Sequence, residues 1–268
     1  MKLAIQHTLL PGATLAEKFD RAADFGFQGV ELAAWGFEKP MSHYADEIRD
    51  AVRASGMEIS SLCTQSADDF VHPDAAERAK RIAGLAQYLQ LADELGAAGV
   101  VALPIRKAVR LPDLSPIGDE ISLTTQLTVA ALHTALSMTQ SARAAVFLEP
   151  LNRYETHYLN TVSQAAELCR SVGSDRVKIM ADLFHMSIEE AQIARAAEAV
   201  IGHIGHIHLA DSNRLEPGQG HTDFTEVFEV LKRADYTGWM AFECRISGDS
   251  DHALPAAVKL LRDCWAQA

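Results

Sequence analysis

One pattern recurs along this chain and restricts its fold more than any other: a helical stretch, then a glycine, then a short apolar run. It occurs in DFGFQGVEL, ASGMEISSL, ELGAAGVVAL and YTGWMAFE. A glycine directly after a helix ends it, because glycine adopts the left-handed backbone conformation at low cost. The repeat therefore indicates alternating β-strands and α-helices and not a helical solenoid.

The expected strands are short, and many are almost continuously apolar. Such runs are typical of parallel strands that are buried on both faces. The expected strands are Lys2–Leu10, Phe27–Ala34, Met57–Cys63, Val100–Ile105, Ala144–Pro150, Val177–Asp182, His203–Ala210 and Trp239–Arg245. The clearest expected helices between them are Leu15–Phe25, Tyr44–Ala54, Ala75–Leu95 and Thr161–Val172.

The number of strand–helix units decides between two architectures. Eight units in 268 residues average about 33 residues each, which fits a (β/α)₈ barrel. An open, doubly wound sheet is the alternative, but it usually carries a G-x-G-x-x-G turn after its first strand. The turn His7–Gly12 lacks that motif. We therefore expect an α/β protein with a single (β/α)₈ TIM barrel, and residues 1–268 forming one domain.

Composition excludes several classes of protein. The chain has 36 acidic and 24 basic residues and a net charge of −12, which disfavours nucleic acid as a partner. No apolar run approaches the roughly 18 residues that a membrane span needs. The N-terminus lacks the apolar stretch of a signal peptide. The four cysteines, Cys63, Cys169, Cys244 and Cys264, lie far apart, so we expect a cytoplasmic protein without a disulfide framework.

Four consecutive expected strands end in side chains that bind metals: Glu149, Asp182, His208 and Glu243. Barrel enzymes carry their chemistry at this end of the strands. A single carboxylate there usually forms a salt bridge, but burying three carboxylates and an imidazole together is very costly without compensation. A divalent cation would compensate them. This oxygen-rich set suits Mn²⁺, Mg²⁺ or Co²⁺ at least as well as Zn²⁺.

Other polar side chains near strand ends have a structural and a functional interpretation. His206 points to the same side of its strand as His208, and we interpret it as a packed or hydrogen-bonded residue deeper in the barrel. Gln6 and His7, which end the first strand, either line the pocket or belong to the core. Trp35 is either an exposed loop aromatic or a wall on which a sugar stacks.

Four cations near the expected mouth bear on the substrate. Arg106, Lys107 and Arg110 lie in the irregular stretch after the fourth strand, and Arg245 follows the eighth. Arg245 shares strand parity with Glu243, so it is the best candidate to face inward. An inward cation favours a carboxylated or phosphorylated substrate, whereas solvent-facing loop charges leave the substrate open.

The second half of the chain resembles a known enzyme family. The similarity is carried by EPLNRYE (149–155), DLFHM (182–186), HIHLADSNR (206–214), PGQG (217–220) and FECR (242–245). These motifs are similar to those of ketose 3-epimerases, the D-tagatose and D-psicose 3-epimerase group of the xylose-isomerase-like sugar isomerase and epimerase superfamily. The similarity spans about residues 144–245, and the first half agrees in its strand pattern only.

The resemblance implies a role for each matching residue. The implied metal ligands are Glu149, Asp182, His208 and Glu243, of which Glu149 and Glu243 are also the catalytic acid/base pair. Glu155, His185 and Arg214 match residues that hold the C1 and C2 oxygens of the sugar. The implied cofactor is one divalent cation per chain, Mn²⁺ first, with Mg²⁺, Co²⁺ or Zn²⁺ as alternatives. The implied partners are a small sugar and further copies of the chain in a homodimer or homotetramer.

The chemistry of epimerisation agrees with these residues. Inverting C3 of a ketose means removing the proton beside the ketone, which gives a cis-enediolate whose charge a divalent ion stabilises. One carboxylate removes the proton from one face and a second returns it on the other. His185 and Arg214 would donate hydrogen bonds to the developing oxyanion.

Several other functions use the same scaffold. An aldose–ketose isomerase or a hydroxypyruvate-isomerase-like enzyme would need the same parts but only one carboxylate for proton transfer. A dehydratase would begin with the same proton abstraction and then lose water. A nuclease of the endonuclease IV type would need more histidine ligands and a basic surface. A sugar-binding barrel without catalysis would be expected to lose part of the set.

Overall fold

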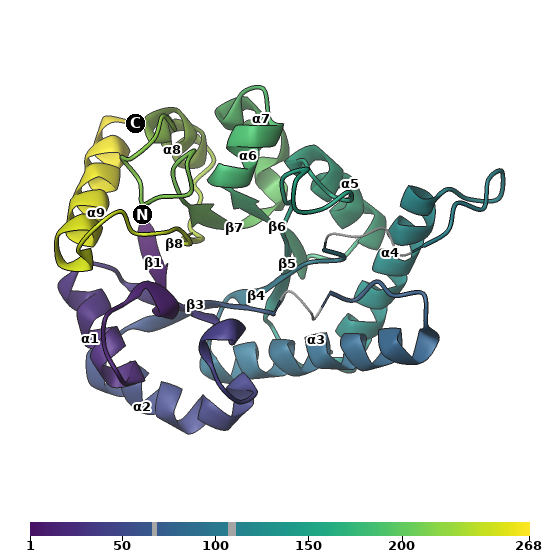
Figure 1. The fold of residues 1–268 in the computed structure, drawn as a ribbon, viewed down its shortest axis with the longest axis horizontal. Coiled ribbons are helices and arrows are strands. Elements are labelled where there is room, and N and C mark those ends of the chain that lie inside the picture. The colour runs from purple at the N-terminus through teal and green to yellow at the C-terminus, as the bar shows by residue number, and fades with distance from the viewer. Residues whose placement is uncertain (66–68, 107–110) are drawn as a thin grey trace.

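The computed structural model describes residues 1–65, 69–106 and 111–268. Within this part of the chain, eight parallel strands form a closed barrel in the order β1 to β8, with β8 paired back onto β1 (Figure 1). The predicted (β/α)₈ barrel is confirmed. The strands are β1 (Lys2–Gln6), β2 (Gly29–Ala33), β3 (Glu58–Cys63), β4 (Gly99–Ala102), β5 (Ala145–Leu148), β6 (Val177–Asp182), β7 (Ile204–Leu209) and β8 (Trp239–Phe242).

The helices surround the ring of strands, as Figure 1 shows. They are α1 (Leu15–Asp24), α2 (Ala45–Ser55), α3 (Ala75–Leu95), α4 (Glu120–Met138), α5 (Val162–Val172), α6 (Leu183–Glu189), α7 (Ile193–Val200), α8 (Phe224–Arg233) and α9 (Ser250–Gln267). None of the helices in the described residues is long and apolar enough to cross a membrane.

Local sequence signals start and end these helices. Thr14 and Thr161 cap α1 and α5, each with its hydroxyl oxygen accepting from the backbone N–H three residues on. Gly56, Gly96 and Gly173 follow α2, α3 and α5 in the left-handed conformation that the glycine pattern predicted. The predicted helix Ala75–Leu95 is confirmed to the residue.

Several strands are shorter than predicted at the end that carries the polar residues. The chain leaves the sheet after Gln6, Ala102 and Phe242, whereas the apolar pattern continued beyond each. His7–Leu9, for example, forms a turn of 3₁₀ helix instead of extending β1. Apolar residues past these points are buried by loops at the barrel mouth, so burial alone overestimates the strand length.

The barrel interior has its own small core. It consists of Ala33, Cys63, Val101, Phe147 and Met180, which alternate along the strands with residues that face the helices. Phe147 fills this space, because a Cβ added at Gly99 or Gly205 would lie 2.7 Å from its ring. A second apolar cluster, of Ala4, Trp239 and Ala241, lies on β1 and β8. Polar side chains such as Gln6, Glu31 and His206 are buried as well.

Candidate active site

The ends of β5 to β8 bring four predicted residues together. The ligand atoms of Glu149, Asp182, His208 and Glu243 all lie within 4.8 Å of one another. Asp182 ends β6 and pairs with His208 on β7, whereas Glu149 and Glu243 directly follow β5 and β8. We call these four residues the ligand cluster.

Asp182 is held in place by the backbone that follows it. Asp182 is the N-cap of α6, and its Oδ1 accepts from the backbone N–H of Phe184 at 2.8 Å. Its other oxygen therefore points into the cluster, 3.8 Å from Nδ1 of His208. Asp182 and His208 are almost fully buried, and Glu149 is 8% exposed. Such burial keeps the carboxylates in one geometry and makes their mutual repulsion strong.

The donor set fits a divalent cation. It offers carboxylate oxygens and one imidazole nitrogen, which suit Mn²⁺, Mg²⁺ or Co²⁺. Three carboxylates at such short separation need positive charge nearby, and one guanidinium, that of Arg214, supplies part of it. With all three carboxylates ionised and His208 neutral, Arg214 balances one of the three negative charges. A divalent cation would balance the two that remain.

Arg214 touches the cluster directly. Its guanidinium donates to Asp182 and to Glu243 and lies over the ring of Phe184, 4.9 Å from the ring centroid. Its backbone has a φ of +63°, which a non-glycine residue rarely adopts. The N–H of Arg214 donates to the carbonyl of Asp211 at 2.8 Å, and its carbonyl accepts from Arg245 at 2.7 Å. The loop after β7 thus aims this side chain at the cluster.

His185 presents a hydrogen-bond donor to the cluster. Its Nδ1 accepts from the side-chain amide of Asn152 at 2.8 Å and from the Asn152 backbone N–H at 3.2 Å. The Asn152 oxygen accepts from Tyr154, which fixes the amide orientation. Burial lowers the pKa of His185 and favours the neutral ring. The proton therefore sits on Nε2, which lies 3.6 Å from Glu149.

The two predicted acid/base carboxyls have different environments. Burial, and then the negative charge of Glu243, raises the pKa of Glu149 well above its usual range. Burial also acts to raise the pKa of Glu243, but Arg214 and His208 outweigh it and hold that pKa below its usual range. A divalent ion would act on both groups through its own charge. The pair thus combines one carboxyl held strongly ionised with one that takes up a proton readily.

A second polar group lies beneath the cluster, in the barrel interior. The carboxylate of Glu31 on β2 is fully buried and contacts both His206 and His208. Gln6 is also buried and hydrogen-bonds to Glu31 and Glu243, which makes it part of this network. The interpretation of His206 as a deeper, hydrogen-bonded residue agrees with this arrangement. Sequence reasoning missed Glu31, although a charged residue inside the apolar run GVELA was a signal for it.

A cavity of about 380 Å³ opens above the cluster and includes the remaining predicted residues. Glu149, His185, Arg214 and Glu243 line it, together with Glu155 and Trp35. Trp35 is 50% exposed, so it is both a loop aromatic and a wall of the cavity. The volume of the cavity suits a monosaccharide, and most of the side chains that line it are polar, as a hydroxyl-rich ligand requires.

The four cations that were expected near the mouth do not share one position. Arg106 lines the cavity, and its guanidinium pairs with Glu155 at 2.7 Å. Arg245 is exposed and donates to the backbone of Asn213, so the expectation that it is the inward cation is wrong. Arg245 follows the end of β8, where strand parity no longer sets its direction. Lys107 and Arg110 lie outside the described residues.

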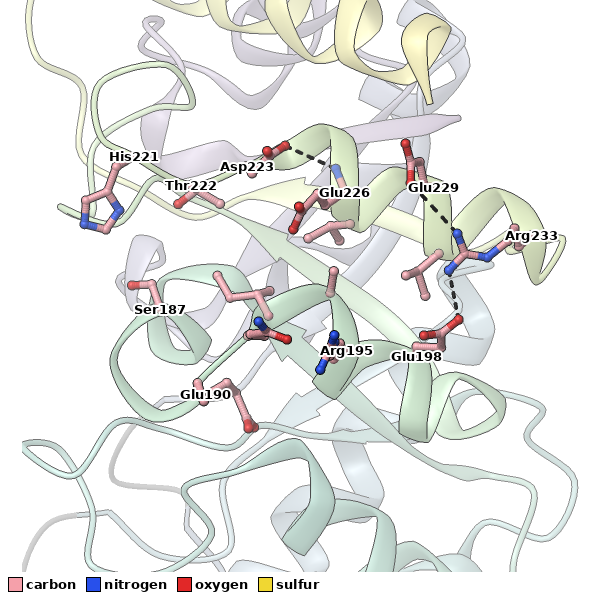
Figure 2. A pocket seen from close by; sticks show the side chains of 16 residues that line it. Ser187, Glu190, Arg195, Glu198, His221, Thr222, Asp223, Glu226, Glu229 and Arg233 are labelled. Carbon is pink, nitrogen blue, oxygen red and sulfur yellow. Dashed lines mark hydrogen bonds and ion pairs between the residues drawn. The ribbon is translucent and has the colours of Figure 1, made fainter.

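A larger hollow of about 540 Å³ lies outside the barrel, between α6, α7 and α8 (Figure 2). Arg233 pairs there with Glu198 at 2.8 Å and approaches Glu229 at 3.9 Å. Figure 2 shows that Arg233 lies between Glu229, which is also on α8, and Glu198 on α7. The ligand cluster does not line this hollow. We therefore assign the candidate active site to the smaller cavity at the barrel mouth.

Comparisons with known proteins agree with this geometry. Residues 19–264 match the family model described as xylose isomerase-like TIM barrel. The chain is 30% identical over 274 residues to 3-dehydro-D-guloside 4-epimerase of Escherichia coli (strain K12), covering 98% of this chain and 100% of the relative. It is 30% identical over 198 residues to L-ribulose 3-epimerase of Mesorhizobium japonicum, covering 74% of this chain and 65% of the relative.

A solved structure is similar along its whole length. The apo crystal structure of 3-keto-D-glucoside 4-epimerase from E. coli superimposes with a TM-score of 0.87 at 26% identity. The alignment covers 98% of this chain and 100% of that chain. The barrel is thus shared with proteins whose names describe the inversion of a sugar carbon.

Proposed function

Because this chain belongs to the xylose isomerase-like TIM barrel family, we propose that it is a divalent-metal-dependent epimerase of a small ketose or keto-sugar. The observation that carries the proposal is the ligand cluster, in which two carboxyls from separate strands face one cavity together with an imidazole and a third carboxylate. The relatives are named sugar epimerases, and they support an isomerase as the class of enzyme.

The proposed reaction inverts the carbon beside a ketone. Glu149, Asp182, His208 and Glu243 would hold the ion, which when bound would stabilise negative charge on the substrate oxygens as a Lewis acid. Glu149 follows β5 and Glu243 follows β8, so they approach the cavity from different sides of the ring. One of these carboxylates removes the proton, and the other returns a proton to the opposite face of the cis-enediolate.

The remaining polar groups orient the sugar. His185 donates from Nε2, the nitrogen that Asn152 leaves free, to a substrate oxygen that becomes negative. Arg214, which also lines the cavity, supplies a second donor. Glu155, which is paired with Arg106, accepts from a substrate hydroxyl. These assignments give Glu155, His185 and Arg214 the roles that the motifs implied.

The carbon that is inverted has two candidates. C3 of a 2-ketose is the one that the motifs favour, and L-ribulose 3-epimerase is a relative of that kind. C4 of a 3-keto sugar is the second, favoured by the relative that matches the whole chain, whose name places the inverted carbon beside the oxidised one. In both substrates the proton is removed from a carbon next to a ketone, so one arrangement of carboxyls serves either.

Two further properties follow the family expectation. We propose that Mn²⁺ is the preferred ion, with Mg²⁺, Co²⁺ or Zn²⁺ as substitutes. We propose that the chain acts in the cytoplasm as a homodimer or homotetramer. Sedimentation of the purified protein at several concentrations measures the second property, and a monomer throughout would refute it.

A substrate panel tests the proposed function. Purified protein is treated with chelator, and one half receives Mn²⁺. Both halves are incubated with 2-ketoses, including L-ribulose and D-tagatose, and with 3-keto-glucosides, and the products are identified by NMR. We expect a metal-dependent epimer of one group. An aldose as the product would make the chain an aldose–ketose isomerase instead of an epimerase, and an unsaturated product would make it a dehydratase.

A further inference from the structure

The buried carboxylate of Glu31 is the centre of a polar network under the ligand cluster. Donors reach it from three other parts of the barrel: Gln6 on β1 at 3.0 Å, Ser61 on β3 at 2.5 Å and His206 on β7 at 2.8 Å. His208 on β7 adds a further contact, with Nε2 at 2.9 Å from Oε1 of Glu31. Glu31 is fully buried, and an ionised carboxylate at such a place persists only where donors surround it.

The two ring nitrogens of His208 have different neighbours. Nε2 faces Glu31, whereas Nδ1 faces the cluster, 3.0 Å from Glu243 and 3.8 Å from Asp182. A carboxylate only accepts hydrogen bonds, so without an ion both nitrogens carry a proton, Nε2 toward Glu31 and Nδ1 toward Glu243. An ion in the cluster would displace the proton on Nδ1 and bind the lone pair there, whereas the proton on Nε2 would stay beside Glu31.

We propose that Glu31 is a positioning residue, which fixes His208 as the Nε2–H tautomer and turns its Nδ1 lone pair into the ligand cluster. This inference rests on the proposed metal dependence. A hydrogen-bonded carboxylate behind an imidazole also makes the imidazole a stronger ligand, because it stabilises the positive charge that the ring gains. Glu31 does not line the cavity, so it takes no direct part in proton transfer.

Gln6 extends the same control to a second ligand. Its amide nitrogen lies 3.0 Å from Oε1 of Glu31 and 3.0 Å from Oε1 of Glu243. One amide group therefore uses its two protons to connect the positioning carboxylate with a carboxylate of the cluster. Displacing Glu31 would free Gln6 as well as His208, so two of the four ligands depend on it.

Metal binding by three proteins tests the proposal: the natural chain, Glu31→Gln and the matched control Ser61→Ala. Ser61 donates to the same carboxylate and lies 3.1 Å from Nε2 of His206, and within the described part of the chain it forms no hydrogen bond to His208. Each metal-free protein is titrated with Mn²⁺ in a calorimeter, and thermal unfolding measures the stability of each. We expect Glu31→Gln to bind Mn²⁺ about 10–100-fold more weakly, which is typical for the loss of such a partner. We expect Ser61→Ala to stay within about threefold of the natural chain because His208 keeps its partner.

The outcomes separate this inference from the proposed function. Equal affinities for the natural chain and Glu31→Gln would overturn the positioning role alone, as would an equal loss in Ser61→Ala, which would mean a general weakening of the barrel. A natural chain that binds no Mn²⁺ would overturn the metal dependence and the inference together.

A measurement on the natural chain covers the case in which Glu31→Gln fails to fold. ¹⁵N NMR of the Mg²⁺-loaded protein, with the His208 signal assigned by its loss in His208→Gln, reports which nitrogen carries the proton. We expect a protonated Nε2 with slow exchange and an unprotonated Nδ1. A proton on Nδ1 would overturn the proposal.

Discussion

At the scale of single residues, the chemistry depends on how a few buried groups are surrounded. Glu149 has its pKa raised by burial and by Glu243, whereas Arg214 and His208 keep Glu243 ionised. His185 is held as a donor by Asn152. Groups of the same kind thus acquire different roles because their neighbours differ, which is how enzymes obtain an acid and a base from two carboxyls.

Removing either acid/base carboxyl tests the two-base arrangement. Glu149→Gln and Glu243→Gln each keep the side-chain volume but remove the proton-transfer group. We expect each to lower kcat at least about 10³-fold, because both faces of the substrate need a base. The rate of epimer formation by NMR is the measurement, at Mn²⁺ concentrations that saturate each variant. More than a tenth of the natural rate in either variant would contradict the mechanism.

His7 gives a pH dependence that is independent of the ligand cluster. Burial, and then the charge of Lys18, lowers the pKa of His7 to about 4 against the opposing effect of Glu31. The unfolded chain therefore binds more protons than the folded one between about pH 6.5 and pH 4, so stability falls as the pH falls through this window. From pH 7 to pH 5 this group should remove about 2 kcal/mol from the free energy of unfolding.

Urea unfolding of the natural chain and of His7→Asn at both pH values measures this contribution. The amide oxygen of Asn replaces Nδ1 as the acceptor for the Ala33 N–H, which lies 3.2 Å from it. The variant should lose less stability than the natural chain over the same interval. An identical pH dependence of the two proteins would mean that His7 is not buried as a neutral ring.

The residues that sequence reasoning identified and those it missed differ in a physical way. Glu149, Asp182, His208 and Glu243 were found because each ends an apolar run, and the ends of parallel strands meet at one edge. Glu31 and Asn152 act on residues far along the chain, with His208 lying 177 positions after Glu31. Without a fixed register between β2 and β7, no pattern in the sequence pairs them.

At the scale of elements, the loop between β7 and α8 carries Arg214 to the cavity. Asp211 follows β7, is 1% exposed, and accepts from the backbone N–H groups of Ser212, Gly218 and Thr222. Gly220 approaches so closely that an added Cβ would lie 2.4 Å from the Asp211 carboxylate. Asp211 thus folds the loop around itself and holds Arg214 over the cluster.

Asp211→Asn should loosen this loop. The amide keeps one acceptor and places its N–H₂ group against a backbone donor, which costs about 1–3 kcal/mol for the group left unsatisfied. We expect kcat/KM to fall by roughly tenfold or more, which corresponds to about 1.4 kcal/mol, and proteolysis within residues 211–222 to become faster. Both are measured on the folded, metal-loaded protein.

Asp223→Asn is the matched control for this variant. Asp223 caps α8 from an exposed position by accepting from Glu226 at 3.1 Å. Asparagine is an equally good N-cap, so activity and proteolysis should remain unchanged. If the two variants behave alike, Asp211 is not the residue that organises the loop.

The sequence predicted the ends of helices better than the ends of strands. The C-terminal ends of helices followed from glycine, since this signal acts within a few positions, as at Gly96 and Gly173. Strand ends did not, because the apolar run continues past Phe242 into residues that loops bury. Arg245 was the best inward candidate among four cations because β8 was expected to extend that far, and the alternative of a solvent-facing charge fits its exposure.

At the scale of the whole molecule, the closed barrel connects stability with the proposed ion. Glu149, Asp182, His208 and Glu243 come from four consecutive strand ends, so an ion among them would join a large part of the ring. A ligand that binds the folded chain alone adds about 2.7 kcal/mol at a hundred times its dissociation constant. We expect Mn²⁺ at that ratio to raise the melting temperature by several degrees, and a chelator to reverse the change. A melting temperature that changes neither with Mn²⁺ nor with chelator would argue against a resident ion.

The central claim is that one carboxylate removes a proton from the substrate and a second carboxylate returns one. The most direct test is to follow the hydrogen at the inverted carbon. The Mn²⁺-loaded protein converts the substrate found in the panel in D₂O, and NMR follows both sugars at early times. The account predicts deuterium at the inverted carbon of the product epimer and none in the recovered substrate, because the two faces are served by different groups. Product that retains its original hydrogen, or substrate that gains deuterium at the same rate, would show a single base and would contradict the account.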